Sequence, residues 1–513
     1  MSIPFPLNNN PNVPPEDSVR ASQLDAPIKP FRAAIAPKKG ISIDPKVLRS
    51  LYNDNKELKR ALVYGLFAVL IIAGSIIAKT GFTYATLAVI VLAIFGLALV
   101  DTWNAIFLFF VYLSLEGMYK YTSNFHPVVY IMAPILSSTI FVAWRIRTRG
   151  ELERKEAKTK TPAKPSLFQR TSGSQEVGLP RIAPWVLALI ALSFLQSANP
   201  DSPGFINSMN GAIVWYIGPM AFFFIAYFAL EHRREAMGFI YTVLVTGFVV
   251  SAYAVVQFYL GKEWVDSHVP GMQNMAIFNY TVGEGRAIEG GAYRPPSTAP
   301  ITGGYVIVSC LAMLAALCIA TMPRMVTWRR TLALLSVSVM AMALAVSGVR
   351  QVILNLCVVI PILLGLSVRR FEDTIRIYFM IFMLAALLTV SFITADIAAE
   401  GKLSRRYGSV FTGNPLENYA NNRGNSLGYI PRAIAVRPFG IGIRRGTRGG
   451  AEGPGFIRGS DGVQVLNNRE TQWNTIHADL GVFGLICLMG FFGTVLYQGA
   501  RICRTLPDPN LRS

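Results

Sequence analysis

The chain alternates long apolar runs with short polar connections from residue 61 almost to its end. A helix needs about 20 mostly apolar residues to cross a hydrocarbon core of roughly 30 Å. Twelve runs reach or approach that length, near 61–79, 82–100, 104–119, 128–144, 182–198, 211–230, 237–260, 301–321, 331–347, 351–368, 375–395 and 473–497. The pattern therefore predicts an all-α polytopic membrane protein with twelve transmembrane helices.

The composition agrees with this prediction. Of the 513 residues, 52% are hydrophobic and 15% are charged, whereas an ordinary soluble domain has roughly 25% charged residues. These values exclude an ordinary soluble enzyme. The five cysteines lie within or beside predicted spans, so they indicate neither a disulfide framework nor a metal cluster. We expect no metal and no cofactor.

The first 60 residues differ from the rest because they contain no early apolar stretch. They also lack a small-residue cleavage site, so they do not form a secretory signal. We expect residues 1–60 to be a cytoplasmic tail that is largely disordered up to residue 45.

The positions of the basic residues predict the orientation of the chain. Lys and Arg number 48 against 29 Asp and Glu, a net charge of +19, which in a soluble protein would suggest binding to nucleic acid. Cytoplasmic loops of membrane proteins carry an excess of Lys and Arg. With both termini in the cytoplasm, 31 of the 48 fall on the cytoplasmic side, six in short outer segments and 11 in the long segment 396–472. We therefore predict a membrane topology and no nucleic-acid partner.

This orientation divides the chain into successive parts. They are a cytoplasmic tail (1–60), transmembrane helices 1–11 (61–395) with a basic cytoplasmic loop (145–181) and an outer loop (261–300), a large periplasmic loop (396–472), transmembrane helix 12 (473–500) and a cytoplasmic C-terminus (501–513). The basic loop fixes topology and is expected to contact anionic membrane lipids.

Two arginines stand out because the short outer segments carry so little positive charge. Arg350 lies between the ninth and tenth predicted spans, and Arg294 lies in a Gly- and Pro-rich approach to the eighth. A cation beside hydrocarbon is costly unless it is paired or faces water. The two residues are candidates for an anion clamp. Alternatively, Arg350 extends to the lipid headgroups and Arg294 is an ordinary surface-loop residue.

The long segment 396–472 exceeds the usual length of a connection, so we expect it to be functional or disordered. Apolar residues in 424–436 have the spacing of a short amphipathic helix, which would lie on the membrane or cap a cavity. Residues 440–462 contain nine glycines in 23 positions and predict a mobile loop.

The last span opens with three ionisable residues, Glu470, His477 and Asp479. His477 follows Glu470 by seven residues, so on a continuous helix the two would share a face, whereas Asp479 would lie on another. A carboxylate or histidine at the mouth of a helical bundle could serve as a general base. The alternative is that these residues bind neighbouring helices through hydrogen bonds.

Four stretches together resemble the bacterial O-antigen ligase and polymerase family of integral-membrane glycan transferases. The stretches are YRPPSTAPITGGYVIVSC, SGVRQVIL, NNRGNSLGYIPRAIAVRPFGIGIRRG and ETQWNTIHADLGVFGLICL, within residues 290–490. In the ligase branch the last element begins with histidine, whereas this chain has Glu470 there. That difference favours a polymerase-like or exopolysaccharide member.

The resemblance implies metal-independent glycosyl transfer at the outer face of a bacterial cytoplasmic (inner) membrane, with no cofactor. The substrate would be a polyprenyl-diphosphate-linked glycan, and other polysaccharide-assembly proteins could be partners. The expected diphosphate ligands are Arg294, Arg350 and Arg423, with Arg437 as a lesser candidate. Glu470 is the expected general base, and His477 and Asp479 are lesser candidates.

Two other functions remain open from the sequence. A flippase for lipid-linked oligosaccharides, or another transporter, would also be polytopic, but such proteins usually show repeated halves with interrupted helices at matching positions. No such pair is evident in the sequence. A non-catalytic scaffold for envelope assembly would use the tail 1–60 and the basic loop 145–181 to bind partners.

Overall fold

The computed structural model describes most of the chain between residues 45 and 505. The described ranges are 45–77, 81–123, 127–159, 180–202, 204–229, 233–269, 293–299, 304–322, 327–349, 360, 371–408, 425–443, 455–458, 464–467 and 472–505. The chain divides into two units, Met1–Tyr52 and Asn53–Ser513, and every contact discussed below lies within the second.

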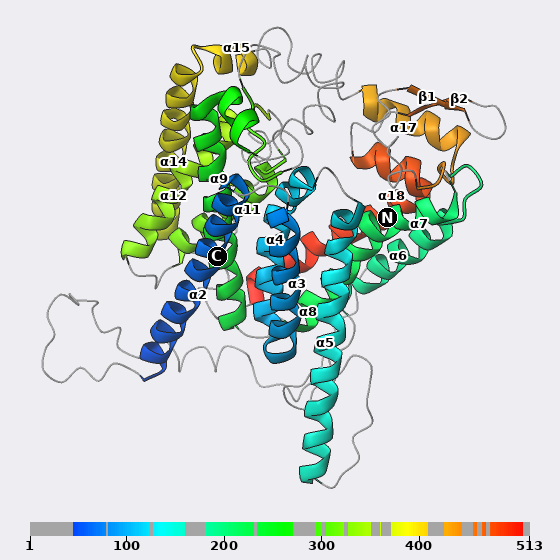
Figure 1. Ribbon diagram of the computed structural model, residues 1–513, viewed down its shortest axis with the longest axis horizontal. Helices are drawn as coiled ribbons and strands as arrows, with labels where there is room; N and C mark the ends of the chain where they lie inside the picture. Colours follow the sequence, from blue (N-terminus) through cyan, green and yellow to red (C-terminus); the bar gives the residue numbers. More distant parts are fainter. Residues whose placement is uncertain are drawn as a thin grey trace, which may run out of the picture. The chain divides into compact units, whose positions relative to one another are not determined.

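Nearly all described elements are helices (Figure 1). They are α2 (Pro45–Ile77), α3 (Gly81–Val100), α4 (Thr102–Thr122), α5 (Pro127–Thr159), α6 (Ala183–Ser197), α7 (Phe205–Ala212), the π-helix η1 (Ile213–Ile217), α8 (Gly218–Ala229), α9 (Arg233–His268), α11 (Val306–Thr321), α12 (Thr327–Val346), α14 (Phe371–Ala398), α15 (Lys402–Gly408), α17 (Asn425–Val436) and α18 (Gln472–Thr505). One antiparallel hairpin pairs β1 (Gly455–Arg458) with β2 (Gln464–Asn467). The predicted helical character is confirmed.

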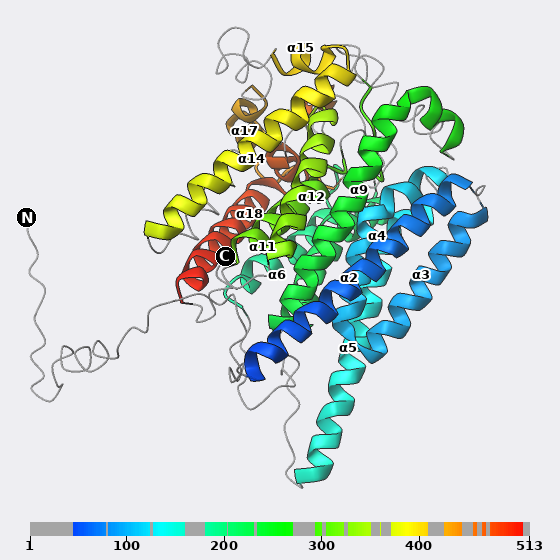
Figure 2. The same cartoon turned by 90° about the vertical axis from the view of Figure 1, so that its left-hand side faces the viewer.

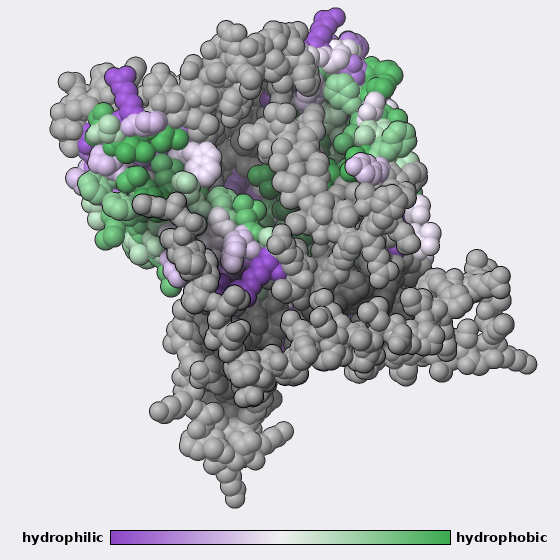
Figure 3. Space-filling view, turned by 180° about the vertical axis from the view of Figure 1, so that it is seen from behind, coloured by the Kyte–Doolittle hydropathy of each residue, from purple (hydrophilic) through white to green (hydrophobic). Residues whose placement is uncertain are grey.

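Several helices have the properties of membrane spans. Within the described ranges, five are long and apolar enough to cross a membrane: Phe205–Tyr227, Arg234–His268, Thr327–Val346, Ile381–Ala398 and Trp473–Arg501. Apolar side chains such as Leu92, Ile307 and Leu496 are largely exposed, and hydrophobic (green) areas are broad among the coloured residues of Figure 3. Extensive exposed apolar surface is typical of helices that face lipid. The chain is therefore a membrane protein.

The larger core combines residues of α2, α3, α4 and α5 with residues of α9, α11 and α12, and α14 packs against α12 (Figure 2). Close packing follows from small residues on the facing helices. A Cβ atom on Gly247 of α9 would lie 2.3 Å from the Cβ of Ala312 on α11, so no larger residue fits. The hydroxyls of Ser251 and Ser309 are 2.8 Å apart across the same interface. These contacts pack α9 closely against α11.

A smaller core joins α6, η1 and α18. Its buried residues include Leu189 of α6, Tyr216 of η1, and Ile476 and Leu480 of α18. Ile430 and Ile434 of α17 pack against it. The amphipathic helix predicted over 424–436 is thus present as α17, and part of its apolar face contacts protein.

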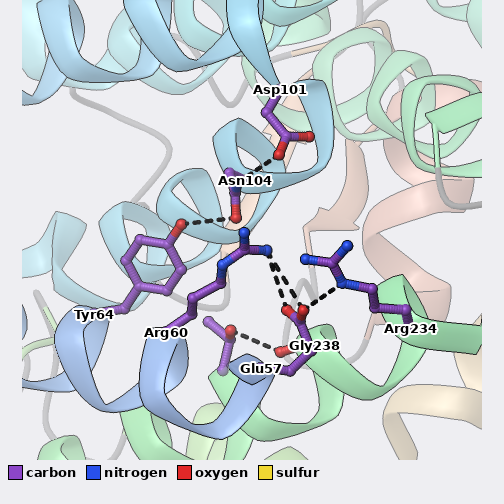
Figure 4. A network of polar contacts seen from close by, with 8 residues as sticks. Glu57, Arg60, Tyr64, Asp101, Asn104, Arg234 and Gly238 are labelled. Atoms are coloured by element: carbon purple, nitrogen blue, oxygen red, sulfur yellow. Dashed lines mark hydrogen bonds and ion pairs between the residues drawn. The ribbon is translucent and has the colours of Figure 1, made fainter. Parts of the chain in front are cut away.

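A buried carboxylate connects α2, α4 and α9 (Figure 4). Glu57 of α2 is 1% exposed and accepts a hydrogen bond from Nε of Arg234 at 2.6 Å. Arg60 lies 3.4 Å from the same carboxylate. The Trp103 ring lies under both guanidinium groups, with its centroid 4.7 Å from Arg60 and 5.3 Å from Arg234. The network explains how the polar end of α2 packs into the protein, because each buried charge has an opposite charge or an aromatic face beside it.

The turn between α3 and α4 belongs to the same region. Asn104 donates to Asp101 at 2.7 Å and accepts from the hydroxyl of Tyr64 at 3.1 Å. Arg147 of α5 donates to the carbonyl of Val100 at 2.8 Å. Burial raises the pKa of the Asp101 carboxyl, and the positive charge of Arg147 opposes this shift. The α3–α4 turn is therefore tied to α2 and α5 by polar contacts.

Two helices extend past the apolar runs that predict them. Helix α2 begins at Pro45, inside the segment 1–60 and at the position up to which disorder was expected. The loop 145–181 begins as helix, because α5 continues to Thr159, and its last turns extend beyond the neighbouring helices (Figures 1 and 2). Residues 145–159 are mainly Arg, Glu, Lys and Ala, which have high helix propensity and prolong the helix past its apolar part.

The span predicted at 211–230 lies in one of the helical segments long and apolar enough to cross a membrane, Phe205–Tyr227. Within that segment α7 passes through η1 into α8, with Gly218 donating to the carbonyl of Ile213. Pro219 follows and has no N–H, so the regular helical bond at that position cannot form. The loop predicted over 440–462 contains strand β1. The predicted span 351–368 lies outside the described residues apart from Ile360.

Candidate functional site

The structure describes four of the seven candidate residues. Arg294, Arg437, His477 and Asp479 are included, whereas Arg350, Arg423 and Glu470 lie outside the described residues. The four described residues occupy two regions, one at the end of α12 and one where α17 meets α18.

Arg294 lies at the C-terminal end of α12. Its Nε donates to the carbonyl of Ser347 at 2.7 Å. The hydroxyls of Tyr305 and Tyr407 donate to the carbonyls of Ala343 and Ala345, at 2.7 Å and 3.0 Å. The last carbonyls of a helix have no partner within the helix, and a cation is favourable there. Three side chains from distant segments therefore complete the end of α12.

The contact of Arg294 joins two of the four stretches that carry the family resemblance. Arg294 belongs to YRPPSTAP and Ser347 to SGVR, and 53 positions separate them in the sequence. Ser347 precedes Arg350 by three positions. The bond also fixes the direction of the Arg294 guanidinium, because Nε lies in its plane.

Arg437 lies directly after α17 and forms an ion pair with Asp201. Its Nη1 is 2.9 Å from the carboxylate, and the side chains of Arg437 and Asp201 are 14% and 8% exposed. A guanidinium that already binds a carboxylate is a weaker ligand for a diphosphate, so Arg437 remains the lesser candidate. The sequence analysis did not identify Asp201, which is 236 positions away and belongs to no recognisable motif.

The turn after α17 crosses α18 through backbone contacts. The amide of Ile441 donates to the carbonyl of Ala478 at 2.7 Å, and the amide of Val482 donates to the carbonyl of Pro438 at 2.8 Å. The close approach requires glycine, because a Cβ atom on Gly440 would lie 2.7 Å from the Ala478 carbonyl. These bonds join the other two stretches of the resemblance.

Helix α18 is interrupted at the same place. Gly481 has φ 69° and ψ −164°, so residues 472–480 form a short helix that is separate from the long one after it. Gln196 of α6 donates to the carbonyl of Phe439 at 2.7 Å and supports the crossing from the opposite side. Glu470 lies outside the described residues, so the shared face of Glu470 and His477 stays a prediction.

The short half of α18 carries both lesser candidates. Asp479 is fully buried and accepts a hydrogen bond from the hydroxyl of Tyr216 at 2.8 Å. His477 is 4% exposed. Ionisable residues in apolar spans and π-helices both occur frequently at functional sites, and here a π-helix contacts such a residue. Tyr216 was not identified from the sequence, since nothing in an apolar run indicates a partner 263 residues away.

The two regions offer different chemistry. The end of α12 presents an oriented guanidinium, which suits a phosphate group. The α17–α18 crossing offers a buried acid beside the long segment 396–472. Within the ranges described, no group of three His, Cys, Asp or Glu side chains is arranged to hold a metal ion. Comparison of the chain with protein-family models, with curated proteins and with solved structures finds no match.

Proposed function

We propose that the protein is a membrane-embedded glycan transferase that polymerises or ligates saccharides carried on a polyprenyl diphosphate. The observation that carries the proposal is the bond from Nε of Arg294 to the carbonyl of Ser347. It joins two stretches selected from the sequence for their likeness to the ligase and polymerase family. The α17–α18 crossing joins the other two.

The proposed reaction is a substitution at the anomeric carbon of the donor sugar. The acceptor hydroxyl oxygen forms the new bond, the bond to the diphosphate oxygen breaks, and Glu470 takes the hydroxyl proton. The polyprenyl diphosphate leaves with the bonding electrons. Arg294, Arg350 and Arg423 bind its developing negative charge, which stabilises the transition state more than the ground state. The reaction requires no metal in this scheme.

The proposal includes a twelve-span topology in the bacterial cytoplasmic membrane, with both termini in the cytoplasm. The polar network around Glu57 supports this topology. Glu57, Arg147 and Arg234 come from the tail, the loop 145–181 and the short connection between the sixth and seventh predicted spans, all assigned to the cytoplasmic side by the basic-residue rule. Arg147 reaches the α3–α4 turn and Arg234 reaches Glu57. A common membrane face for these residues is the simplest way to satisfy both the charge rule and the contacts.

The same placement puts segment 396–472 on the periplasmic side. Its elements α15 and α17 lie toward the end of the helices opposite the extended end of α5 (Figures 1 and 2). Tyr407 of α15 contacts the end of α12, where Arg294 lies. Segment 396–472 would therefore cover the substrate, with the lipid chain between helices and the sugars beneath the segment.

The test uses the purified protein in lipid vesicles with a polyprenyl-diphosphate-linked oligosaccharide. Longer saccharides should form with the unsubstituted protein, and Arg350→Ala and Arg294→Ala should reduce the rate at least 100-fold, since loss of one preorganised charge contact costs about 10²–10³ in rate. Arg405→Ala and Arg432→Ala change exposed arginines of segment 396–472 and serve as matched controls.

Glu470→Gln tests the general base separately, with an expected loss of about 10²–10⁴ in rate. Normal product length and amount with Arg350→Ala would overturn the proposed function. Unaltered turnover with Glu470→Gln would remove only the assignment of the base.

A further inference from the structure

Residues 293–299 form irregular backbone buried between helices. Pro295, Pro296, Ser297, Thr298 and Ala299 are all buried. The hydroxyl of Ser297 bonds the carbonyl of Val250, in the middle of α9. Val250 precedes the break of α9 at Gly261 by eleven residues, which corresponds to about 16 Å along a helix. Non-helical backbone at such depth in a membrane protein occurs only where protein surrounds it, usually at a functional site.

Three short hydrogen bonds anchor this segment to two helices. The amide of Ser297 donates to Oε1 of Gln257 at 2.7 Å, and the hydroxyl of Ser297 donates to Val250 at 2.7 Å. The hydroxyl of Thr298 donates to the carbonyl of Ser114 on α4 at 2.6 Å. Gln257 is completely buried. The side-chain oxygen of Gln257 therefore takes the place of the water molecule that the backbone N–H of Ser297 would otherwise bind.

The anchor holds an unfavourable conformation. Ser297 has φ 54°, in the left-handed region that residues with a Cβ atom rarely adopt. A turn closes around it through the bond from the Ala299 amide to the Pro296 carbonyl, at 3.1 Å. Strain of this kind persists only where the surroundings determine the conformation, and it is concentrated at functional sites. The hydrogen bonds of Ser297 to Gln257 and to Val250 hold this backbone conformation in place.

Two prolines connect the anchored turn to Arg294. The sequence reads Arg294, Pro295, Pro296, Ser297, and each proline fixes its φ near −65° and restricts the residue before it. The three-residue connection is therefore stiff. A displacement of Ser297 would be passed on to Arg294, and from there to the bond with Ser347.

We infer that Gln257 and Ser297 are positioning residues that set the location of the Arg294 guanidinium for a diphosphate group. The inference rests on the proposed function and deepens it, because it assigns the placement of a substrate-binding cation to a buried anchor. Neither positioning residue touches the substrate. Both act through the Pro295–Pro296 connection.

The test measures binding of inorganic pyrophosphate to the full-length protein in lipid nanodiscs by calorimetry. Gln257→Leu removes the acceptor of the Ser297 amide and should weaken binding about tenfold, the effect of one buried hydrogen bond. In an Arg294→Lys background the same substitution should change binding by less than about twofold, because coupled residues are not additive. Ser251→Ala is the matched control: it removes a buried hydroxyl contact of α9 next to Val250 without touching residues 293–299.

The thermal unfolding midpoint of each variant is measured in the same samples. If Gln257→Leu does not fold, Ser297→Ala replaces it, since it removes the bond to Val250 and keeps the Cβ atom. Equal weakening in both backgrounds, no weakening at all, or no binding of pyrophosphate by the unsubstituted protein would each overturn the inference. If Gln257→Leu weakens pyrophosphate binding only when Arg294 is present, but the protein transfers no saccharide, the inference is supported and the proposed function is overturned. If the protein transfers saccharide normally and Gln257→Leu leaves pyrophosphate binding unchanged, the proposed function is supported and the inference is overturned.

Discussion

Replacing Gly481 by alanine tests whether the crossing between α17 and α18 fixes segment 396–472 to the last span. Gly481 has φ 69° and ψ −164°, a combination that is accessible essentially only to glycine. A Cβ atom there would lie 2.5 Å from both the carbonyl oxygen of Pro438 and the carbonyl carbon of Phe439. These are backbone atoms, which cannot rotate away. The Gly481→Ala protein can fold only if the two backbones separate.

The cost of this separation has two parts. The backbone conformation of Gly481 costs about 1–3 kcal/mol for a residue with a side chain. Separation also breaks the bonds from Ile441 to Ala478 and from Val482 to Pro438, each worth about 1 kcal/mol. We therefore expect Gly481→Ala to destabilise the crossing by about 3–5 kcal/mol.

Hydrogen exchange of the purified protein measures this effect directly. The amides of Ile441 and Val482 should exchange faster by about 100-fold or more in Gly481→Ala, since 1.4 kcal/mol corresponds to a factor of ten. Gly493→Ala is the control on the same helix, because a Cβ atom at Gly493 meets nothing within 4 Å. Equal protection of the two amides in Gly481→Ala and in the unsubstituted protein would refute the crossing as described.

Three further variants test other contacts. Tyr216→Phe removes the hydroxyl that donates to buried Asp479, and a lower thermal midpoint is expected from a loss of about 1–3 kcal/mol; an unchanged midpoint would contradict the contact. Arg437→Ala leaves the carboxylate of Asp201 without this ion pair and should destabilise the protein by about 3 kcal/mol; adding Asp201→Ala should recover part of the loss, and a further loss would count against the pair. Burial raises the pKa of the Asp101 carboxyl, so the contribution of Asp101 to stability is present below the ordinary carboxyl pKa and is lost as the pH rises through the raised pKa. Asp101→Asn should flatten that part of a curve of stability against pH. An identical curve for the variant would be evidence against the raised pKa.

The helices could be predicted from the sequence because an apolar run of sufficient length has few other stable arrangements in a membrane. The short helix α17 was also predictable, since its apolar residues follow helical spacing. The ends of helices were less predictable. Apolarity marks where a span enters lipid, but α2 and α5 continue into polar sequence because their residues favour helix there.

The candidate residues could be selected from the sequence, but their partners could not. Arg294 was chosen as an isolated cation, whereas its partner is a backbone carbonyl, which carries no sequence signal. Gly481 resembled an ordinary glycine of a span, and its conformation depends on the turn after α17. Long-range pairs such as Tyr216 and Asp479 arise from tertiary packing, so neither local spacing nor composition reveals them.

The interrupted helices bear on the transporter alternative, for which the sequence showed no pair of interrupted helices at matching positions. Among the described helices, α9 is broken at Gly261 and α18 at Gly481. In transporters such breaks lie near the middle of corresponding helices and open a central binding site. Here seven residues follow the break in α9, whereas nine precede the break in α18, so the breaks lie near opposite ends of their helices. The backbone of Pro438–Ile441 fills the break in α18. A break that is filled by backbone from another segment ties the two segments together, which fits the proposed cover over a substrate better than the rocking motion of alternating access.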